Sequence, residues 1–291
     1  MSQSESPGGI FGLSYDGETR VFEALKLVST AIIVLVGAWP IYWITQLAFT
    51  EYETVEDDVV TVFPTPDIFT FGNFTVLTDP EMYTYMFNTV VVAIGTIVTV
   101  VLVSLIAGYG LARLDFPQKE NFARILLIGY LFSPIVIGIP LYQIWQSIGL
   151  LGTRFGLIIA LSAISMPFAV WLMWKYIMTI PAAHEEAAWV DGASRWRGFR
   201  DVVVPQCRPA IIAAALFAFA LAWNDFTFAQ ILLPQTDTTT FAPGILRAMG
   251  QTQFLPDAYL MAISLAMTLP PLLFAYFMQS YLLKGFQVRA L

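Results

Sequence analysis

Long apolar runs alternate along the chain with short polar segments, which is the pattern of a protein that crosses a membrane several times. Spanning the hydrocarbon core takes about 20 apolar residues in an α-helix, and each run meets that requirement. We therefore predict an all-α membrane protein with six transmembrane helices. The predicted spans are residues 27–49, 85–112, 123–145, 155–176, 211–233 and 258–283.

The composition strengthens this interpretation. Of the 291 residues, 57% are hydrophobic and 12% are charged. Soluble domains carry about 25% charged residues, so this chain has too little charge to solvate a large globule, and a soluble enzyme is the weaker alternative. The one cysteine, Cys207, cannot form a disulfide within the chain, and we assign it no role.

Basic residues orient the predicted spans, because Lys and Arg remain on the cytoplasmic side during membrane insertion. Two of the 14 Lys and Arg residues, Arg154 and Arg247, lie on the side opposite the termini. The remaining 12 (14 minus 2) lie on the side of the termini. Both termini are therefore predicted to be cytoplasmic, with residues 1–20 forming a short tail and residues 21–291 forming the transmembrane domain.

The same count places residues 50–85 outside the cell, in a loop that holds eight acidic residues and no Lys or Arg. A solvated loop accounts for this charge, although an acidic face would also suit a protein living in high salt. Asn73-Phe74-Thr75 matches the acceptor pattern for N-glycosylation, a triplet that often arises by chance.

Several predicted spans contain prolines, which can kink a helix, or glycines, which let neighbouring helices pack closely. Freed carbonyl groups beside a proline are tolerated at membrane depth where protein or a cavity satisfies them, so kinked helices are expected. The prolines in question are Pro134, Pro140, Pro167, Pro270 and Pro271. Gly108 and Gly110, near the end of the second span, would permit close helix packing.

A polar segment, residues 181–206, interrupts the apolar pattern on the cytoplasmic side. Pro181 suits the first turn of a helix, Gly192 is a natural stop, and Ser194 can cap a second helix that is expected to end at Pro205. The apolar residues of that second helix are expected to share one face: Trp196, Phe199 and Val203. We predict two short amphipathic helices joined by a glycine bend.

Resting on lipid headgroups is one possible role for such helices. It fits the basic residues and Trp189, but it leaves unexplained why Glu185, Glu186 and Asp191 would lie against an anionic membrane surface.

The sequence lacks the motifs of ATP binding, metal binding and nucleophilic catalysis. No glycine-rich phosphate loop followed by Lys and Ser/Thr is present, so the chain is not expected to bind ATP. The one histidine, His184, is expected on a solvated helix face, and no Cys/His cluster suggests a metal site. A nucleophilic catalytic set is also missing, so we do not expect an enzyme.

The polar segment also carries a spaced motif: Glu186-Ala187-Ala188, three residues, Gly192, nine residues, then Val202, one residue, Val204 and Pro205. It resembles the EAA loop of bacterial and archaeal ABC importer permeases, whose pattern ends in Ile-x-Leu-Pro. Valine at both apolar positions preserves the apolar character. Further segments resemble the carbohydrate-importer, maltose-type (MalG-like) branch of the family: residues 88–89, 109–113, 140–142, 149–153, 167–168, 223–224 and 279–285.

This resemblance implies a type I ABC importer permease fold with a cytoplasmic coupling helix that inserts into a separate ATPase subunit. Glu186 would make the charged contact and Gly192 would set the bend. The coupling loop would comprise Glu185, Glu186, Ala187, Ala188, Asp191, Gly192 and Pro205. Implied partners are a second, homologous permease subunit, two ATP-binding subunits that use ATP and Mg, an external solute-binding protein and the prokaryotic cell membrane, with no nucleic acid and no cofactor on this chain.

A possible substrate pathway lies in the fifth predicted span. Asp225 is a carboxylate at membrane depth, and such groups are functional candidates by default. Asn224 and Thr227 are expected on one helix face, where they could hydrogen-bond a sugar beside the plane of Trp223. Asp225 could equally pair with another helix or lie in water near the outer end of the span.

The function that the resemblance implies is sugar or oligosaccharide import, driven by a partner's ATP hydrolysis. Another small solute, such as a polyamine, glycerol phosphate or phosphate, is the alternative. The near absence of basic residues from the spans disfavours anions. A self-sufficient secondary transporter or channel should carry several intramembrane ionisable groups, and only Asp225 qualifies.

Overall fold

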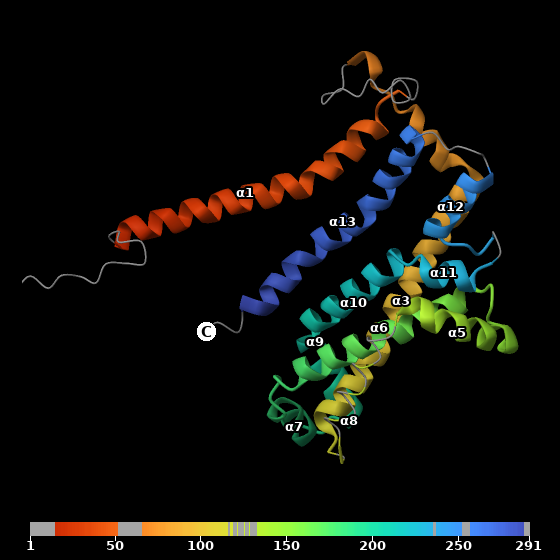
Figure 1. Ribbon diagram of the computed structural model, residues 1–291. Helices are drawn as coiled ribbons and strands as arrows, with labels where there is room; N and C mark the ends of the chain where they lie inside the picture. The colour runs from red at the N-terminus through yellow and green to blue at the C-terminus, as the bar shows by residue number, and fades with distance from the viewer. Residues whose placement is uncertain are drawn as a thin grey trace, which may run out of the picture. The chain divides into compact units, whose positions relative to one another are not determined.

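The computed structural model, drawn in Figure 1, describes residues 15–51, 66–115, 133–234, 237–251 and 257–287, with a few positions between 117 and 128. Within those residues the regular structure is helical, apart from one isolated β-bridge between Thr50 and Phe69. The long helices are α1 (Tyr15–Ala48), α3 (Pro80–Arg113), α5 (Pro134–Ile148), α6 (Arg154–Ile177), α10 (Arg208–Trp223) and α13 (Asp257–Gln287).

Shorter elements connect the long helices. They are η1 (Pro66–Ile68), η2 (Gly72–Thr78), α7 (Ala183–Val190), α8 (Arg195–Arg197), the π-helix η4 (Gly198–Val203), α9 (Val204–Gln206), α11 (Thr227–Leu232) and α12 (Phe241–Gln251).

Four helices within the described residues are long and apolar enough to cross a membrane. They are Gly17–Ala48, Pro80–Arg113, Arg154–Ile177 and Asp257–Gln279, and they coincide with the first, second, fourth and sixth predicted spans. A fifth crossing arises if Arg195–Gln206 and Arg208–Trp223, bent by 73°, are counted as one broken span. Part of the predicted span 123–145 lies outside the described residues, and its described helix, α5, has 15 residues.

Two helices begin earlier than the hydropathy pattern indicates. α1 begins at Tyr15, inside the predicted tail, and α3 begins at Pro80, inside the predicted external loop. The start of α3 has a local cause, because the Asp79 side chain accepts a hydrogen bond from the Glu81 N–H and Pro80 occupies the first turn.

The fifth predicted span, residues 211–233, is not one continuous helix, which corrects the prediction. α10 ends at Trp223 and α11 begins at Thr227. The described helices do run through Pro140, Pro167 and Pro270-Pro271, while Pro134 begins α5, where a missing N–H has no consequence.

The chain divides into two compact units, the larger formed by residues 75–255 and 266–291. In this unit α3 lies along α6 and α10, as Figure 1 shows. α10 presents a buried stripe of alanines, Ala210, Ala214 and Ala218, at four-residue spacing. These small side chains allow the helices to approach closely.

At Gly108, α3 lies against the backbone of α6. A Cβ atom at this position would lie 2.6 Å from Met173 Cβ and 2.9 Å from the Trp174 backbone nitrogen. The prediction of close packing is therefore confirmed for Gly108. For Gly110, the nearest atom to an added Cβ among the described residues would be Leu114 Cδ1, at 3.9 Å, so the described part of the chain shows no close approach there.

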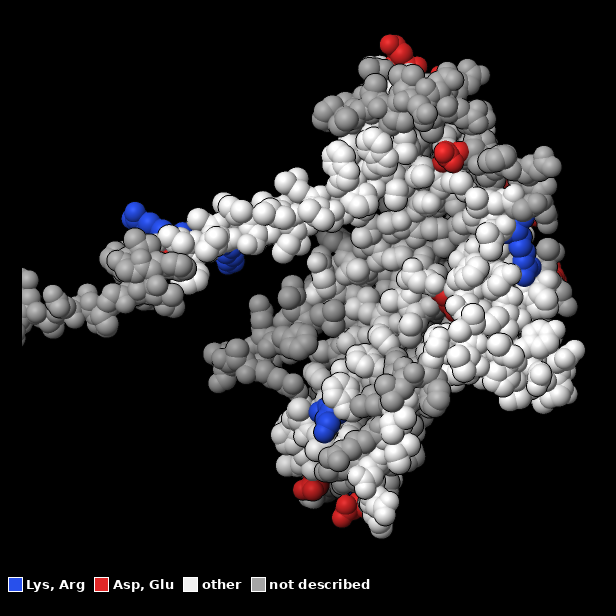
Figure 2. Space-filling view, in the orientation of Figure 1, with Lys and Arg blue, Asp and Glu red and all other residues white. Residues whose placement is uncertain are grey.

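The opposite face of α3 is apolar and exposed, with Ile94, Val98, Leu102 and Ile106 at four-residue spacing. Figure 2 shows one face of the molecule, on which charged side chains are few. Apolar stripes of this kind suit contact with lipid or with neighbouring apolar helices.

The smaller unit comprises residues 1–74 and 256–265. In its aromatic cluster, Phe49 stacks on Phe69 and packs at a tilt against Phe74, with ring centroids 5.3 Å and 4.9 Å apart. Asn73 is 2% exposed, and its Nδ2 donates to the carbonyls of Ala48 (3.0 Å) and Thr50 (2.7 Å). The nitrogen that would carry a glycan is thus buried and hydrogen-bonded in this conformation.

Candidate functional site

The polar segment forms two helical arms joined by a bend at Gly192. The first arm, α7, ends in the hydrogen bonds of a Schellman motif, in which the Ala193 N–H donates to the Ala188 carbonyl at 2.9 Å and the Gly192 N–H donates to the Trp189 carbonyl at 3.0 Å. Gly192 has φ +89°, a left-handed conformation that favours glycine. The predicted glycine bend is therefore confirmed, together with its cause.

The second arm begins where the sequence predicts and ends later. Ser194 Oγ accepts a hydrogen bond from the Arg197 N–H at 3.3 Å and caps α8. Pro205 does not end the helix, which corrects the prediction. The π-turn of η4 carries the chain into α9, and Pro205 then lies in the first turn of α9, where its missing N–H is tolerated. The axis turns by 73° only at Cys207, before α10.

The apolar face predicted for the second arm is only partly correct. Phe199 and Val203 are buried, whereas Trp196 is 62% exposed and contacts the Phe199 ring at 5.4 Å. Trp196 lies on the α-helical turn and the other two lie on the π-helix, so the helical spacing used for the prediction does not hold across the junction.

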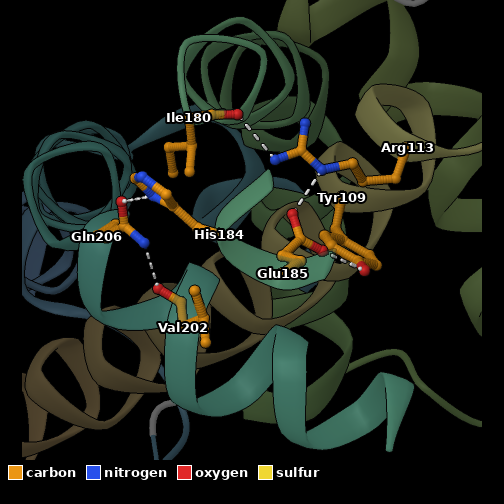
Figure 3. Close-up of polar contacts among 7 residues, drawn as sticks. All are labelled: Tyr109, Arg113, Ile180, His184, Glu185, Val202 and Gln206. Atoms are coloured by element: carbon orange, nitrogen blue, oxygen red, sulfur yellow. Dashed lines mark hydrogen bonds and ion pairs between the residues drawn. The ribbon is translucent and has the colours of Figure 1, made fainter. Parts of the chain in front are cut away.

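Glu185 anchors the first arm to the end of α3. It is 0% exposed, and both carboxylate oxygens are used: Oε1 accepts from Arg113 Nε at 2.6 Å and Oε2 accepts from the Tyr109 hydroxyl at 2.8 Å. Arg113 Nη2 also donates to the Ile180 carbonyl at 2.9 Å, just before α7 (Figure 3). A buried carboxylate requires such a partner, because an unpaired charge is costly away from water.

The second arm is held against the same end of α3. The Tyr109 ring packs on Phe199 with centroids 4.6 Å apart. Trp189 of α7 lies directly against Gly198, where an added Cβ would be 2.6 Å from Trp189 Nε1, and the Arg195 guanidinium lies 4.0 Å from the Trp189 ring. Tyr109 therefore contacts both arms at once.

His184 adds a further link between the arms. Its Nδ1 lies 3.3 Å from Gln206 Oε1, and Gln206 Nε2 donates to the Val202 carbonyl at 2.9 Å (Figure 3). The side chain of His184 is exposed, as predicted.

The other predicted residues of α7 and its C-terminal cap lie mostly at the surface. Glu186, Ala187 and Asp191 are exposed, Ala188 is half-buried, and Val190 of α7 is 86% exposed. Beside them lies a cavity of about 560 Å³ lined by Tyr109, Glu186, Trp189, Arg195 and Trp196, among others. α7 thus has one face fixed to α3 and another that presents an acid and an apolar side chain.

Sequence reasoning did not identify Arg113 or Tyr109 as parts of this site. The available signal was a Tyr and an Arg four residues apart at the end of an apolar span, which places them on one helix face. That spacing does not identify the partner, Glu185, which follows Arg113 by 72 residues.

The residues predicted for a substrate pathway lie at the break between α10 and α11. The Asp225 carboxylate accepts from the backbone N–H groups of Phe228 (3.2 Å) and Ala229 (2.9 Å) and so caps α11. Asn224 ends α10, and Thr227 begins α11. The expectation that Asn224 and Thr227 share one helix face is therefore wrong, because the capping carboxylate allows the helix to break between them.

Trp223 is nearly buried, and its Nε1 donates to the Met267 carbonyl of α13 at 3.1 Å. The described part of the chain contains no group of three or more His, Cys, Asp or Glu side chains that could hold a metal ion.

Comparisons with known proteins agree with this architecture. Residues 100–288 match the protein family described as the binding-protein-dependent transport system inner membrane component. The chain is 29% identical over 261 residues to the diacetylchitobiose uptake system permease protein NgcG of Streptomyces coelicolor, covering 88% of this chain and 84% of the relative.

It is also 26% identical over 280 residues to the trehalose/maltose transport system permease protein MalG of Thermococcus litoralis, covering 92% of this chain and 96% of the relative. The fold is similar to a chain of a bacterial ABC transporter involved in the import of the acidic polysaccharide alginate. That match has a TM-score of 0.77 and 23% identity, covering 92% of this chain and 99% of the other.

Proposed function

Because this chain belongs to the family of binding-protein-dependent transport system inner membrane components, we propose that it is the permease subunit of an ATP-driven importer of a sugar or oligosaccharide. In this proposal the chain forms half of a translocation pathway and couples to a separate ATPase subunit through residues 181–206.

The observation that carries the coupling proposal is the two-sided character of α7. One face is fixed to α3 through the buried Glu185, while Glu186, Val190 and Asp191 are exposed on the other side. A short helix that presents an acid beside an exposed apolar side chain is suited to dock into a groove on a partner protein. Glu186 is the proposed charged contact, and Val190 is the proposed apolar one.

The proposal of a sugar as the transported solute is supported by the names of the relatives, which concern diacetylchitobiose and trehalose/maltose. The other solutes considered above, such as a polyamine or glycerol phosphate, are the alternative within the same family. Trp223, Asn224, Asp225 and Thr227 remain the proposed pathway residues. Because Asp225 already accepts two backbone hydrogen bonds, its proposed role is to position Asn224 and Thr227.

The proposed topology has six spans and both termini in the cytoplasm. Residues 1–20 form the cytoplasmic tail, residues 50–85 form the external acidic loop, and residues 181–206 form the cytoplasmic coupling loop. The distribution of Lys and Arg supports this orientation. Proposed partners are a second, homologous permease subunit, two ATP-binding subunits that use ATP and Mg, and an external solute-binding protein. This chain itself carries no catalytic step.

A charge-neutralising change at the docking face tests the proposal. Glu186→Gln in the assembled importer is expected to lower both solute uptake and binding-protein-stimulated ATP hydrolysis, because it removes the charged contact. The matched control is Asp201→Asn, which alters another exposed acid of the same loop, with a side chain 59% exposed and paired with Arg200 at 3.4 Å. Wild-type uptake and hydrolysis in Glu186→Gln, or equal defects in the two variants, would contradict the proposed contact.

A further inference from the structure

We propose that the Arg113–Glu185–Tyr109 cluster makes α3 the helix that receives motion from the coupling loop, by joining α7 and the last turn of α3 into one rigid body. The proposal rests on the function proposed above and assigns positioning roles to three residues.

Short turns connect α7 to the helices before and after it. α7 has eight residues, and the chain reaches it from α6 through residues 178–182 and leaves it through the bend at Gly192. Both connections are short hydrogen-bonded turns, and the next long helix, α10, begins only after a further turn of 73°. Side-chain contacts therefore add to these turns in fixing how α7 is oriented.

The contacts that do so converge on one turn of α3. Arg113 donates to Glu185 on α7 and to the Ile180 carbonyl ahead of it, so one guanidinium fixes two points on the first arm. Tyr109, one turn earlier, donates to the same carboxylate and packs on Phe199 of the second arm. Two residues of α3 thus hold both arms of the loop.

The burial of this cluster gives it rigidity. Glu185 is fully buried, and the Arg113 side chain is 16% exposed, so water and salt screen the ion pair weakly. Arg113 is the last residue of α3, where the negative end of the helix dipole also favours a cation. Tilting α7 away from α3 would separate this pair.

A close contact between α3 and α6 connects the Arg113–Glu185–Tyr109 cluster to the membrane-spanning part of the chain. Five residues before Arg113, Gly108 brings α3 into backbone contact with α6 at Met173 and Trp174. A movement imposed on α7 would therefore displace α3 and α6 together. In this arrangement the exposed Glu186 contacts the ATPase subunit, while the buried Glu185 beside it transmits the movement to α3.

The experiment compares Glu185→Gln and Arg113→Lys with Tyr109→Phe in the assembled importer. Glu185→Gln keeps the shape and loses the charge, and Arg113→Lys keeps the charge and loses the planar fork. Tyr109→Phe removes one hydroxyl and keeps the ring on Phe199. Copurification of the ATPase subunit, ATP hydrolysis and solute uptake are measured at a temperature where each variant is folded.

Glu185→Gln and Arg113→Lys are expected to retain the ATPase subunit and ATP hydrolysis while the solute transported per ATP falls roughly tenfold, the scale of coupling between distant sites. Tyr109→Phe is expected to show a smaller loss. Unchanged transport per ATP in the first two variants, with only a lowered melting temperature, would overturn the proposal. If Glu186→Gln leaves uptake and hydrolysis intact, the docking function itself fails, which is a separate outcome.

A distance measurement tests rigidity directly. Spin labels at Val98→Cys on the exposed face of α3 and at Ala183→Cys at the exposed start of α7 are introduced in a Cys207→Ala background. The distance between the labels is expected to remain the same in the nucleotide-free and ATP-bound importer, and to broaden when Glu185→Gln is added. A change in this distance on ATP binding in the otherwise unaltered protein would refute the rigid link.

Discussion

Replacing Gly108 by alanine tests whether the contact between α3 and α6 is as close as the structure places it. The new Cβ would lie 2.6 Å from Met173 Cβ, 2.9 Å from the Trp174 nitrogen and 3.0 Å from the Met173 carbonyl carbon. Carbon atoms normally rest about 3.5–4.0 Å apart, so the helices must separate by about 1 Å. Two of the three neighbours are backbone atoms, which cannot move aside by changing rotamer.

The size of the effect follows from two opposing contributions. Overpacking a well-packed interface destabilises by about 1–3 kcal/mol. Alanine also gains about 1 kcal/mol over glycine inside a helix. Gly110→Ala, two residues along the same helix, receives the second contribution without the first, because among the described residues its Cβ would meet Leu114 Cδ1 alone, at 3.9 Å. The two variants should therefore differ by about 1–3 kcal/mol, with Gly108→Ala the less stable.

The assay is a thermal melt of the purified complex in detergent, followed by loss of the monodisperse peak on size exclusion. About 2–4 °C per kcal/mol is expected for a chain of this size class, so the melting temperatures should differ by several degrees. Uptake by Gly108→Ala should also fall, since α3 and α6 would no longer move together. Equal melting temperatures for the two alanine variants would refute the close approach.

Two further predictions concern the bend and the helix cap. Gly192→Ala should destabilise the loop by about 1–2 kcal/mol, because φ at this position is +89°. Gly192→Asn should be milder, since Asn tolerates the left-handed region. Uptake assays with both variants check this, and equal uptake would contradict the backbone explanation. Asp225→Ala should lose about 1 kcal/mol of stability through the lost cap on α11, whereas Asp225→Asn keeps one of the two acceptor oxygens and should lose less. Equal losses of stability in the two Asp225 variants would show that the charge matters more than the cap.

Local signals in the sequence were sufficient to predict the position or the end of several helices. Hydropathy located α1, α3, α6 and α13, because apolar length is a property of each segment by itself. The glycine stop of α7 and the serine cap of α8 were also correct, since both depend on residues within one turn of the helix end.

Three of the errors share a cause. The break at Asp225, the passage of the helix through Pro205 and the exposure of Trp196 each depend on a backbone conformation that departs from regular α-helix. Averaged hydropathy and a fixed helical period do not register a capping carboxylate or a π-turn. Each of these errors concerns the backbone geometry of a residue that the sequence pattern had singled out.

The sequence by itself determined that this chain is an all-α membrane protein, and the motif in residues 181–206 indicated the importer family to which the chain belongs. Only the tertiary structure decided that Glu185 faces inward to Arg113 and Tyr109 while its neighbour Glu186 faces outward. Adjacent residues on a helix point about 100° apart, so one glutamate can face away from the core while the other faces it. Which one does so depends on a partner 72 residues away, and no local pattern encodes that distance.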